Sequence, residues 1–356
     1  IGAPANRVER YAPVAYPVGR HLSYPQPAAT GYSETREDTV IYHGLFVLGY
    51  GPIGVEEPRF GNVPLSDFDD VELEFRFVDE AYTAPHMAGI NKVTYRTRSQ
   101  RMKLYPGNIA EDNEVATFGD PNDITRRTRP ETVRATVVLH FPEGLFKSTR
   151  EGNDRSRRRE FYFAYRPVGA TTWTDLPLLW VERERRTAFS VEYDIAFPEA
   201  GEYDIRTTYS GDSDNDSVYD TAQLIAIRSE REAPLPLNEE LAVVAVRIRA
   251  SKQLSGGLDR LNFVLRQFAP KWTGSGWSGF QPVDHPAWSY AEALAGLSAG
   301  EDRIDRSLID GDSLKAWADQ EPDWRCDLLV RGNQRIGQLV STICAAGRAR
   351  DTFIGT

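Results

Sequence analysis

The stretch Phe189-Ser190-Val191-Glu192-Tyr193-Asp194-Ile195-Ala196-Phe197 alternates apolar and polar side chains. A period of two is typical of a β-strand that buries one face, so this stretch predicts such a strand. Three neighbouring runs share the alternation. Their apolar positions are Val133, Ala135, Val137, Leu139 and Phe141 in the first run, Phe161, Phe163 and Tyr165 in the second, and Tyr203, Ile205, Thr207 and Tyr209 in the third.

Turn-rich spacers separate these runs, and Trp173 lies in a short Thr-Thr-Trp-Thr-Asp-Leu segment that predicts a further strand. Several short antiparallel strands around such a tryptophan are typical of a β-sandwich of the fibronectin type III kind. We therefore expect a sandwich over residues 130–229. A linker at 230–240, which contains Ala233-Pro234-Leu235-Pro236-Leu237, would close it.

The chain before the sandwich is divided into an arm or linker at 1–13, which has no period, and a domain at 14–129. Ile41 to Tyr50 is an apolar run that contains glycines, and Val71 to Phe77 alternates with period two, so both predict strands. Between them, Phe60-Gly61-Asn62-Val63-Pro64-Leu65 has the composition of a hairpin turn.

The chain after the linker, 241–356, is predicted to mix strands and helices. Leu241 to Ala250 alternates, whereas Trp288 to Leu297 and Ser313 to Ala318 favour short helices. The last helix is the clearest, because five apolar residues fall at helical spacing. These are Ile336, Leu339, Val340, Ile343 and Cys344. The fold class is thus mainly β with some α (α+β), in several domains.

One segment of this region fits two structures. Leu258, Leu261, Leu265 and Phe268 have helical spacing, yet Leu261 to Leu265 could equally form a strand that ends before Pro270. Periodicity alone leaves both alternatives open.

The composition is that of a globular protein, with 40% hydrophobic and 26% charged residues among 356. The net charge is -10, although 36 of the 42 cationic residues are Arg. An acidic chain without a basic stripe predicts no stable nucleic-acid binding. The guanidinium group of Arg suits carboxylates at protein interfaces. Codon bias is the alternative explanation for the excess of Arg over Lys. No apolar run is long enough for a membrane helix, so membrane insertion is not expected.

Both ends of the sequence suggest a piece of a longer polypeptide. The first residue is Ile1 rather than Met, and the stretch from Gly347 to Thr356 directly follows a strongly patterned helix.

Two cysteines, Cys326 and Cys344, form no disulfide framework or metal spacing and fit folding in a reducing cytosol. Cys344 lies on the apolar stripe of the last helix, which favours a buried hydrophobe over a reactive thiol.

Motifs for catalysis or cofactor binding are not found. The sequence has no Gly-rich phosphate loop, no nucleophile elbow and no His pair at metal spacing. The five histidines are scattered, at His21, His43, His86, His140 and His285, with His140 on the outward face of its strand. We expect no catalytic residues, no cofactor and no enzymatic activity.

The best metal candidate is an acidic run that contains Asp212, Asp214 and Asp216, spaced like the start of a calcium loop. A calcium loop requires Gly at its sixth position and Glu at its twelfth, where this chain has Ser217 and Gln223. A solvated turn is therefore favoured, and no metal site is predicted. A solvated hairpin tip or a protein interface is likewise favoured over nucleic-acid binding for the basic run Arg155-Ser156-Arg157-Arg158-Arg159.

Several segments, in order, resemble a known family. They are Tyr42 to Ile53, Phe60 to Leu65, Asp69 to Arg76, Leu139-His140-Phe141-Pro142-Glu143-Gly144-Leu145-Phe146, Leu241 to Ala250, His285-Pro286-Ala287-Trp288 and the helix from Gln334 to Ala346. The chain resembles the host-specificity, or tip attachment, protein J family of siphophages and gene transfer agents. In that family Asn-Pro-Ala-Trp opens a helix, and His285 departs from the Asn. The resemblance favours the strand for Leu261 to Leu265.

The resemblance implies a structural tail-tip or baseplate hub protein that closes the tail tube and links it to host receptor recognition. The hub parts would be 14–129 and 241–356, with the sandwich inserted between them. The implied partners are two further copies in a homotrimer, the distal tail protein, the C-terminus of the tape-measure protein and small tip proteins. A C-terminal region absent from this sequence would contact the receptor.

The implied location is the virion tail tip, after assembly in the host bacterial cytoplasm. The rival hypothesis is a carbohydrate-binding or cell-wall-degrading tail protein. Exposed aromatic residues that line a groove with paired carboxylates would support that rival.

Overall fold

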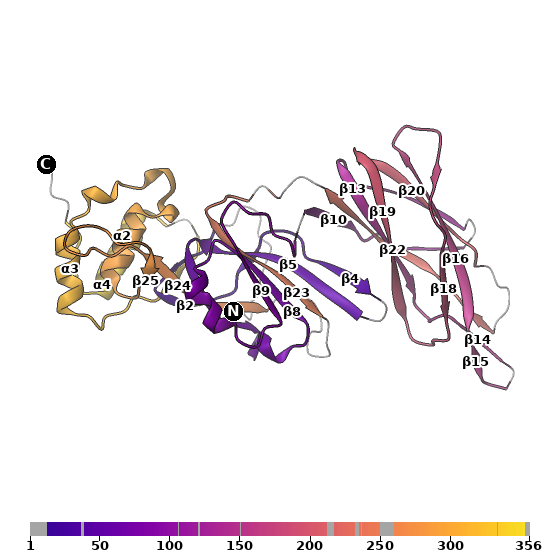
Figure 1. The fold of residues 1–356 in the computed structure, drawn as a ribbon, viewed down its shortest axis with the longest axis horizontal. Coiled ribbons are helices and arrows are strands. Elements are labelled where there is room, and N and C mark those ends of the chain that lie inside the picture. Colours follow the sequence, from indigo (N-terminus) through magenta and orange to yellow (C-terminus); the bar gives the residue numbers. More distant parts are fainter. Residues whose placement is uncertain are drawn as a thin grey trace. The chain divides into compact units, whose positions relative to one another are not determined.

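The computed structural model describes residues 13–36, 39–105, 107–119, 122–149, 151–211, 217–231, 235, 237–249, 260–332 and 334–352. The chain is mainly β and forms two compact units (Figure 1). The flanking unit combines Ile1–Gly31, Tyr42–Tyr105 and Pro236–Thr356, and the sandwich unit combines Tyr32–Ile41 with Pro106–Leu235.

The flanking unit contains two larger sheets built from both sides of the sandwich segment. The first has the order β2-β24-β6-β7, with β25 beside β24, and comprises β2 (Arg20–Ser23), β6 (Ile53–Phe60), β7 (Val63–Pro64), β24 (Leu261–Ala269) and β25 (Gln281–Pro282). The second has the order β3-β5-β23-β8-β9 and comprises β3 (Gln26–Pro27), β5 (Thr39–Tyr50), β8 (Val71–Arg76), β9 (Lys92–Arg96) and β23 (Leu241–Arg249). Beside them lie η1 (Leu65–Asp67), α1 (Glu80–Thr83) and η2 (Ala84–Met87).

An apolar core draws on both of these sheets. Its fully buried members include Leu48, Val55, Phe75, Val244 and Phe263. The predicted strands at 41–50 and 71–77 are confirmed by β5 and β8, and the hairpin at 60–65 is confirmed by the β6–β7 pair. Gly61 turns this hairpin with a positive φ of 61°, a conformation that glycine adopts without strain.

The strand predicted at 241–250 is present as β23, but its burial differs from the expected one-sided pattern. Six consecutive residues, from Leu241 to Val246, are buried. The reason is that β23 lies between β5 and β8 in the middle of its sheet, where both faces are covered. The alternatives for 261–265 resolve to a strand, because β24 runs from Leu261 to Ala269.

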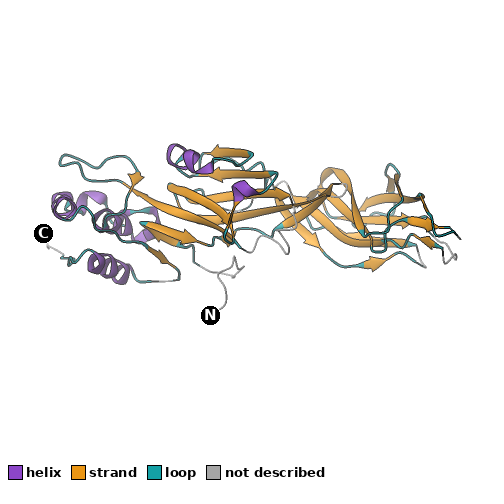
Figure 2. Ribbon diagram, turned by 90° about the horizontal axis from the view of Figure 1, so that it is seen from below, coloured by secondary structure: helices purple, strands orange, loops and turns teal. Residues whose placement is uncertain are grey.

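The helices that follow β25 lie near the C-terminus in Figures 1 and 2. They are α2 (Pro286–Ala295), η3 (Leu297–Asp302), η4 (Arg306–Leu308), α3 (Gly311–Gln320) and α4 (Ile336–Ala346), accompanied by the paired strands β1 (Tyr16–Val18) and β26 (Leu328–Val330). The three predicted helices are confirmed. Leu339, Val340, Ile343 and Cys344 are buried along α4, as the predicted stripe requires.

The sandwich unit contains two five-stranded sheets with one shared core. One sheet has the order β10-β22-β13-β19, with β11 beside β22, and comprises β10 (Asn108–Asp112), β11 (Ala116–Thr117), β13 (Thr132–Phe141), β19 (Phe189–Gly201) and β22 (Gln223–Arg231). The other has the order β12-β20-β16-β17, with β18 beside β16, and comprises β12 (Asp123–Arg127), β16 (Arg157–Pro167), β17 (Thr174–Asp175), β18 (Leu179–Arg183) and β20 (Tyr203–Tyr209). A small sheet joins β14 (Phe146–Ser148), β15 (Asp154–Arg155) and β21 (Val218–Tyr219), and β4 (Tyr32–Arg36) pairs with β5.

The four alternating runs of the sequence supply most of the sandwich core. Val137, Phe161, Ile195 and Ile205 are almost fully buried in it. The hydroxyl of Tyr203 donates a hydrogen bond to the carbonyl oxygen of Glu199, 2.7 Å away, in the manner of the tyrosine corner of β-sandwiches.

The compact unit is larger than the predicted segment 130–229. It also contains β10, β11 and β12, and β22 continues to Arg231. Phe118 and Ile124 of this earlier stretch are buried in the core. The alternation gave no signal here because β12 has a single apolar residue among five.

The strand predicted in the Thr-Thr-Trp-Thr-Asp-Leu segment is present as β17, although it comprises only Thr174 and Asp175. Trp173 directly precedes this strand and is partly exposed. Its indole contacts two guanidinium groups, as described below. Of the linker expected at 230–240, residues 230 and 231 belong to β22, and residues 232–234 and 236 lie outside the described residues.

Candidate interaction surface

The outward side of the sheet β12-β20-β16-β18 carries aromatic and charged side chains. Period-two alternation on these strands places core residues on one side and leaves the intervening residues on the other. We call the outward set the aromatic face; its members are Arg127, Arg158, Glu160, Tyr162, Arg166, Trp173, Trp180, Asp204 and Arg206. Strand register places Arg127 opposite Asp204, Asp204 opposite Arg166, and Glu160 opposite Trp180.

Trp173 is the anchor at one side of the aromatic face. The guanidinium carbons of Arg166 and Arg206 lie 4.5 Å and 4.6 Å from the centre of its ring system. Both distances are within cation–π range, so the ring holds the two guanidinium groups in place.

Trp180 and Tyr162 are the most exposed aromatic residues of this face. Their exposed fractions are 55% and 48%. The Arg158 guanidinium lies 5.1 Å from the Trp180 ring centre, and the Tyr162 hydroxyl donates a hydrogen bond to Glu160 at 2.9 Å. That hydrogen bond to a carboxylate raises the pKa of Tyr162 above its ordinary value.

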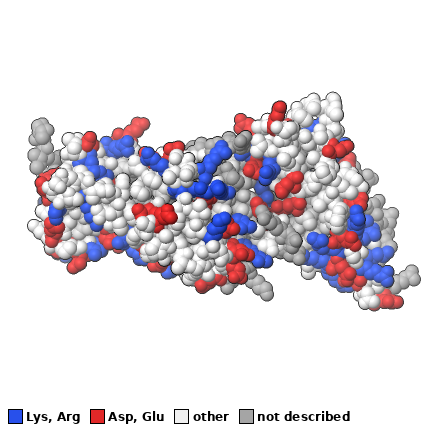
Figure 3. Space-filling model, viewed as in Figure 1, with Lys and Arg blue, Asp and Glu red and all other residues white. Residues whose placement is uncertain are grey.

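The charges of the aromatic face are paired with one exception. Asp204 contacts Arg127 at 2.9 Å and Arg166 at 3.3 Å, and Glu160 contacts Arg158 at 3.1 Å. Arg206 has no carboxylate partner within the described part of the chain. On the side of the molecule shown in Figure 3, acidic and basic side chains are interspersed.

Trp180 and Tyr162 were not identified from the sequence as outward-facing aromatic residues, although the period-two alternation indicates it. Trp180 lies between Leu179 and Val181, which pack in or against the core, so its place in the alternation indicates an outward side chain. The same argument applies to Tyr162 between Phe161 and Phe163.

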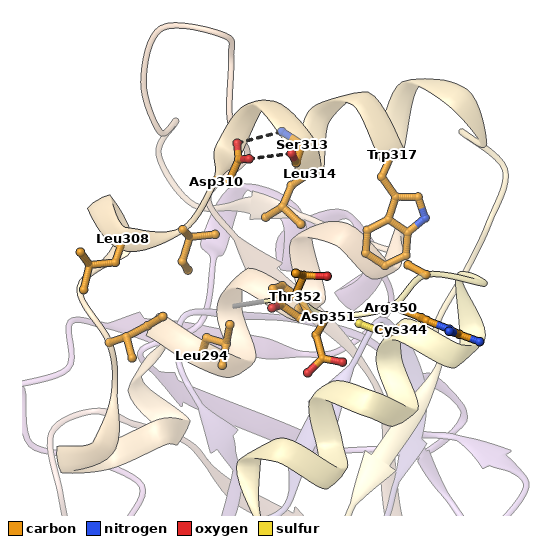
Figure 4. A pocket seen from close by; sticks show the side chains of 14 residues that line it. Leu294, Leu308, Asp310, Ser313, Leu314, Trp317, Cys344, Arg350, Asp351 and Thr352 are labelled. Carbon is orange, nitrogen blue, oxygen red and sulfur yellow. Dashed lines mark hydrogen bonds between the residues drawn. The ribbon is translucent and has the colours of Figure 1, made fainter. Parts of the chain in front are cut away.

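A second concave feature lies among the helices of the flanking unit. A pocket of about 570 Å³ is lined by side chains from α2, the 304–310 loop, α3, α4 and the segment after α4. Figure 4 shows Leu314 and Trp317 reaching into it from α3, and Asp310 bonded to Ser313 at the start of that helix. Leu308, at 76% exposure, is the most exposed of the large apolar residues in the described chain.

Cys344 also lines this pocket, and burial raises the pKa of its thiol to about 11. Cys326 is buried as well, and burial raises its pKa to about 11 too. Thiolates are the nucleophilic and metal-binding form, so neither group has the character of a reactive thiol.

Two acidic residues of the flanking unit, Glu56 and Asp284, are paired with arginines. Glu56 accepts hydrogen bonds from Tyr82 at 2.5 Å and Arg20 at 2.9 Å. Burial raises the pKa of Glu56, but these two hydrogen bonds outweigh it and lower the pKa below its ordinary value. Asp284 pairs with Arg266 at 2.6 Å. This pairing is typical of structural ion pairs rather than of a general acid.

The histidines occupy separate places. His140 contacts the Ser190 hydroxyl at 2.9 Å, and His43 is buried. His285 caps α2: its Nδ1 accepts a hydrogen bond from the backbone N–H of Ala287 at 3.1 Å, and Pro286 follows at the first helical position. The imidazole of His285 thus makes the capping hydrogen bond that the Asn side chain of the family motif would make at this position.

The weak metal candidate, Asp212, Asp214 and Asp216, lies outside the described residues. Among the residues that are described, no group of three or more His, Cys, Asp or Glu side chains could hold a metal ion. The basic run is not wholly a hairpin tip, because Arg159 is buried in β16 and pairs with Asp220, with Arg157 3.7 Å from the same carboxylate.

No helix in the described part of the chain is long and apolar enough to cross a membrane.

No curated protein matches the chain. Residues 116–233 match the family model described as the tip attachment protein J FNIII-A domain, a range that covers most of the sandwich unit. Through this domain the chain is similar to tip attachment protein J.

Proposed function

We propose that the chain is a structural hub protein at the tail tip of a siphophage, a gene transfer agent or another phage-derived tail. The observation that carries the proposal is the match of residues 116–233 to the FNIII-A domain of tip attachment protein J. The chain's place in the particle would be the virion tail tip, after assembly in the host cytoplasm.

The proposed hub is the flanking unit. Strand β23, which follows the sandwich, pairs with β8, which precedes it, from Val243 opposite Arg76 to Ile248 opposite Val71. Arg76 also donates a hydrogen bond to the carbonyl oxygen of Asn238 at 2.9 Å. The flanking unit is therefore built from the chain segments before and after the sandwich, an arrangement that supports the proposal of a hub with an inserted sandwich.

The proposed mechanism uses packed interfaces rather than bond chemistry. Three copies in a ring would close the tail tube, since a closed cyclic assembly seals a cylindrical channel. Neighbours would be the distal tail protein, the end of the tape-measure protein and small tip proteins. Receptor engagement through a further C-terminal region would open the ring.

We propose further that the chain is not an enzyme. The rival hypothesis, a carbohydrate-binding or cell-wall-degrading protein, draws on the exposed aromatic rings of the sandwich. Trp173 and Trp180, however, already contact guanidinium groups, and Glu160 and Asp204 are ion-paired. Neither observation supports a pair of free carboxylates around a sugar site.

A reconstruction of the assembled tail tip tests the hub proposal. We expect three copies around the channel, with the flanking unit nearest the axis and the sandwich outside. A sandwich that lines the channel, or another copy number, would contradict it. Hydrolysis of peptidoglycan by the purified chain, abolished by substitution of one acidic residue, would support the rival.

A further inference from the structure

We infer that the aromatic face of the sandwich binds an acidic segment of a protein partner, whose carboxylate is received by Arg206. This inference goes beyond the hub role and does not depend on it. The family match concerns the domain as a whole and assigns no function to this side of it.

The exposure of the aromatic residues is the first observation. Trp180 and Tyr162 keep about half of their surface in solvent, so folding of the sandwich does not account for rings of this size on the outward side. Tryptophan, tyrosine and arginine are the residues that most often dominate the free energy of protein–protein binding. Here all three types lie on adjacent strands of one sheet.

The charge pattern is the second observation. Arg127, Arg158 and Arg166 each contact a carboxylate of the same face, whereas Arg206 has no such partner among the described residues. Its guanidinium is nevertheless fixed at 4.6 Å from the Trp173 ring centre. A held guanidinium loses little further entropy when it binds, and its planar fork suits a carboxylate in a bidentate contact.

The contacts of the tryptophan rings favour a protein over a polysaccharide as the partner of the aromatic face. Sugars stack on open aromatic ring faces, but guanidinium groups already contact the rings of Trp173 and Trp180. The remaining surface of Trp180 and Tyr162 suits apolar side chains, which would flank an Asp or Glu directed at Arg206.

The test selects binders from a yeast-displayed library of short random peptides with the full chain as bait. We expect enrichment of peptides with Asp or Glu next to apolar residues. Binding of these peptides should weaken about tenfold or more in Arg206→Ala and in Trp180→Ala. Arg206→Lys should restore only part of the affinity, because Lys keeps the charge but loses the planar contact.

The matched control is Arg134→Ala, which removes an exposed arginine from β13 in the other sheet. It should leave peptide binding unchanged, and thermal melts should show that all variants are folded. Failure to enrich any peptide, enrichment without acidic residues, or full binding by Arg206→Ala would overturn the inference. Binding of polygalacturonate, abolished by Arg206→Ala, in the absence of peptide binding would overturn it in favour of an acidic polysaccharide.

Discussion

The guanidinium of Arg228 lies 3.6 Å from the carboxylate of Glu192, and their side chains are only 6% and 14% exposed. Arg228 of β22 and Glu192 of β19 both contact β4, a strand that is distant from them in sequence. Arg228 lies 4.9 Å from the ring centre of Tyr32 and donates a hydrogen bond to the carbonyl oxygen of Ser33. Glu192 accepts a hydrogen bond from the backbone N–H of Thr35 at 2.6 Å.

Arg228→Ala is therefore expected to lower the free energy of unfolding of the sandwich unit by about 3 kcal/mol, because it leaves Glu192 buried without its cation. The amide of Thr35 should exchange faster with deuterium as β4 loosens. Urea unfolding and hydrogen exchange measure the two effects. Arg134→Ala, whose Glu230 partner is 4.0 Å away at the surface, should cost less than about 1 kcal/mol. Equal effects of the two substitutions would contradict this role for Arg228.

Glu192 and Glu292 should give the protein an unusual pH dependence. Burial raises the pKa of both above the ordinary 4.5, even though Arg228 and Arg306 oppose it. The native state then holds more protons than the unfolded state above about pH 4.5, so the stability contributed by these groups is present below that pH. It is lost as the pH rises through the raised pKa values. Urea unfolding of Glu292→Gln across this range should show a weaker decline with pH than the parent chain shows; an unchanged slope would count against the shift.

His285 should make the stability of α2 depend on pH in the opposite sense. Burial lowers the pKa of its imidazole below the ordinary 6.5, and the neutral ring is the form that accepts the hydrogen bond from Ala287. The unfolded state binds the proton first, so stability present above about pH 6.5 is lost as the pH falls below it. His285→Asn should keep the cap and remove this dependence, whereas His285→Ala should cost about 1 kcal/mol. Thermal melts of the three proteins at pH 5.5 and 7.5 distinguish these outcomes.

The two thiols should be unreactive in the folded protein. With a pKa of about 11, Cys326 and Cys344 are ionised to about one part in a thousand at pH 8. A colorimetric thiol reagent should label neither until denaturant is added, and then label both. Rapid labelling of native Cys344, which lines the helical pocket, would show that the pocket admits the reagent and that the thiol is ionised.

Period-two alternation was enough to predict most of the sandwich and of the flanking strands, because burial of one face imposes it directly. The segment Tyr32 to Arg36 carried no such signal, since its attachment to the sandwich depends on Arg228 and Glu192. Contacts between residues so far apart in sequence cannot be inferred from local pattern. The helix cap at His285 was visible only through the family resemblance.

The candidate site was less predictable than the fold. Sequence reasoning considered the arginine run at 155–159 as one feature, yet alternation divides it: Arg159 is buried against Asp220, and Arg158 faces outward beside Trp180. Arg206 has no motif around it in the sequence. Its distinction is the lack of a carboxylate partner in the described structure, which only the three-dimensional arrangement reveals.

The limits of the sandwich can be tested by excision of chain segments. Excised residues 130–229 should fail to fold, because they lack β12, the neighbour of β20, together with the buried side chains of Phe118 and Ile124. Loss of two large core residues and a strand costs a free energy comparable to the net stability of an ordinary domain. Excised residues 106–235 should fold, as seen by a cooperative melt in circular dichroism.

This longer segment should still be less stable than the sandwich within the full chain, because residues 32–41 are missing and the Glu192 carboxylate loses the Thr35 N–H. A synthetic peptide of residues 32–41 should raise its melting temperature in a concentration-dependent way, since a ligand that binds only the native state stabilises it. The same peptide should have no effect on the Arg228→Ala form of the segment. A cooperative melt of 130–229 at the temperature of the longer segment would show that β10 to β12 are dispensable, and would restore the narrower boundaries.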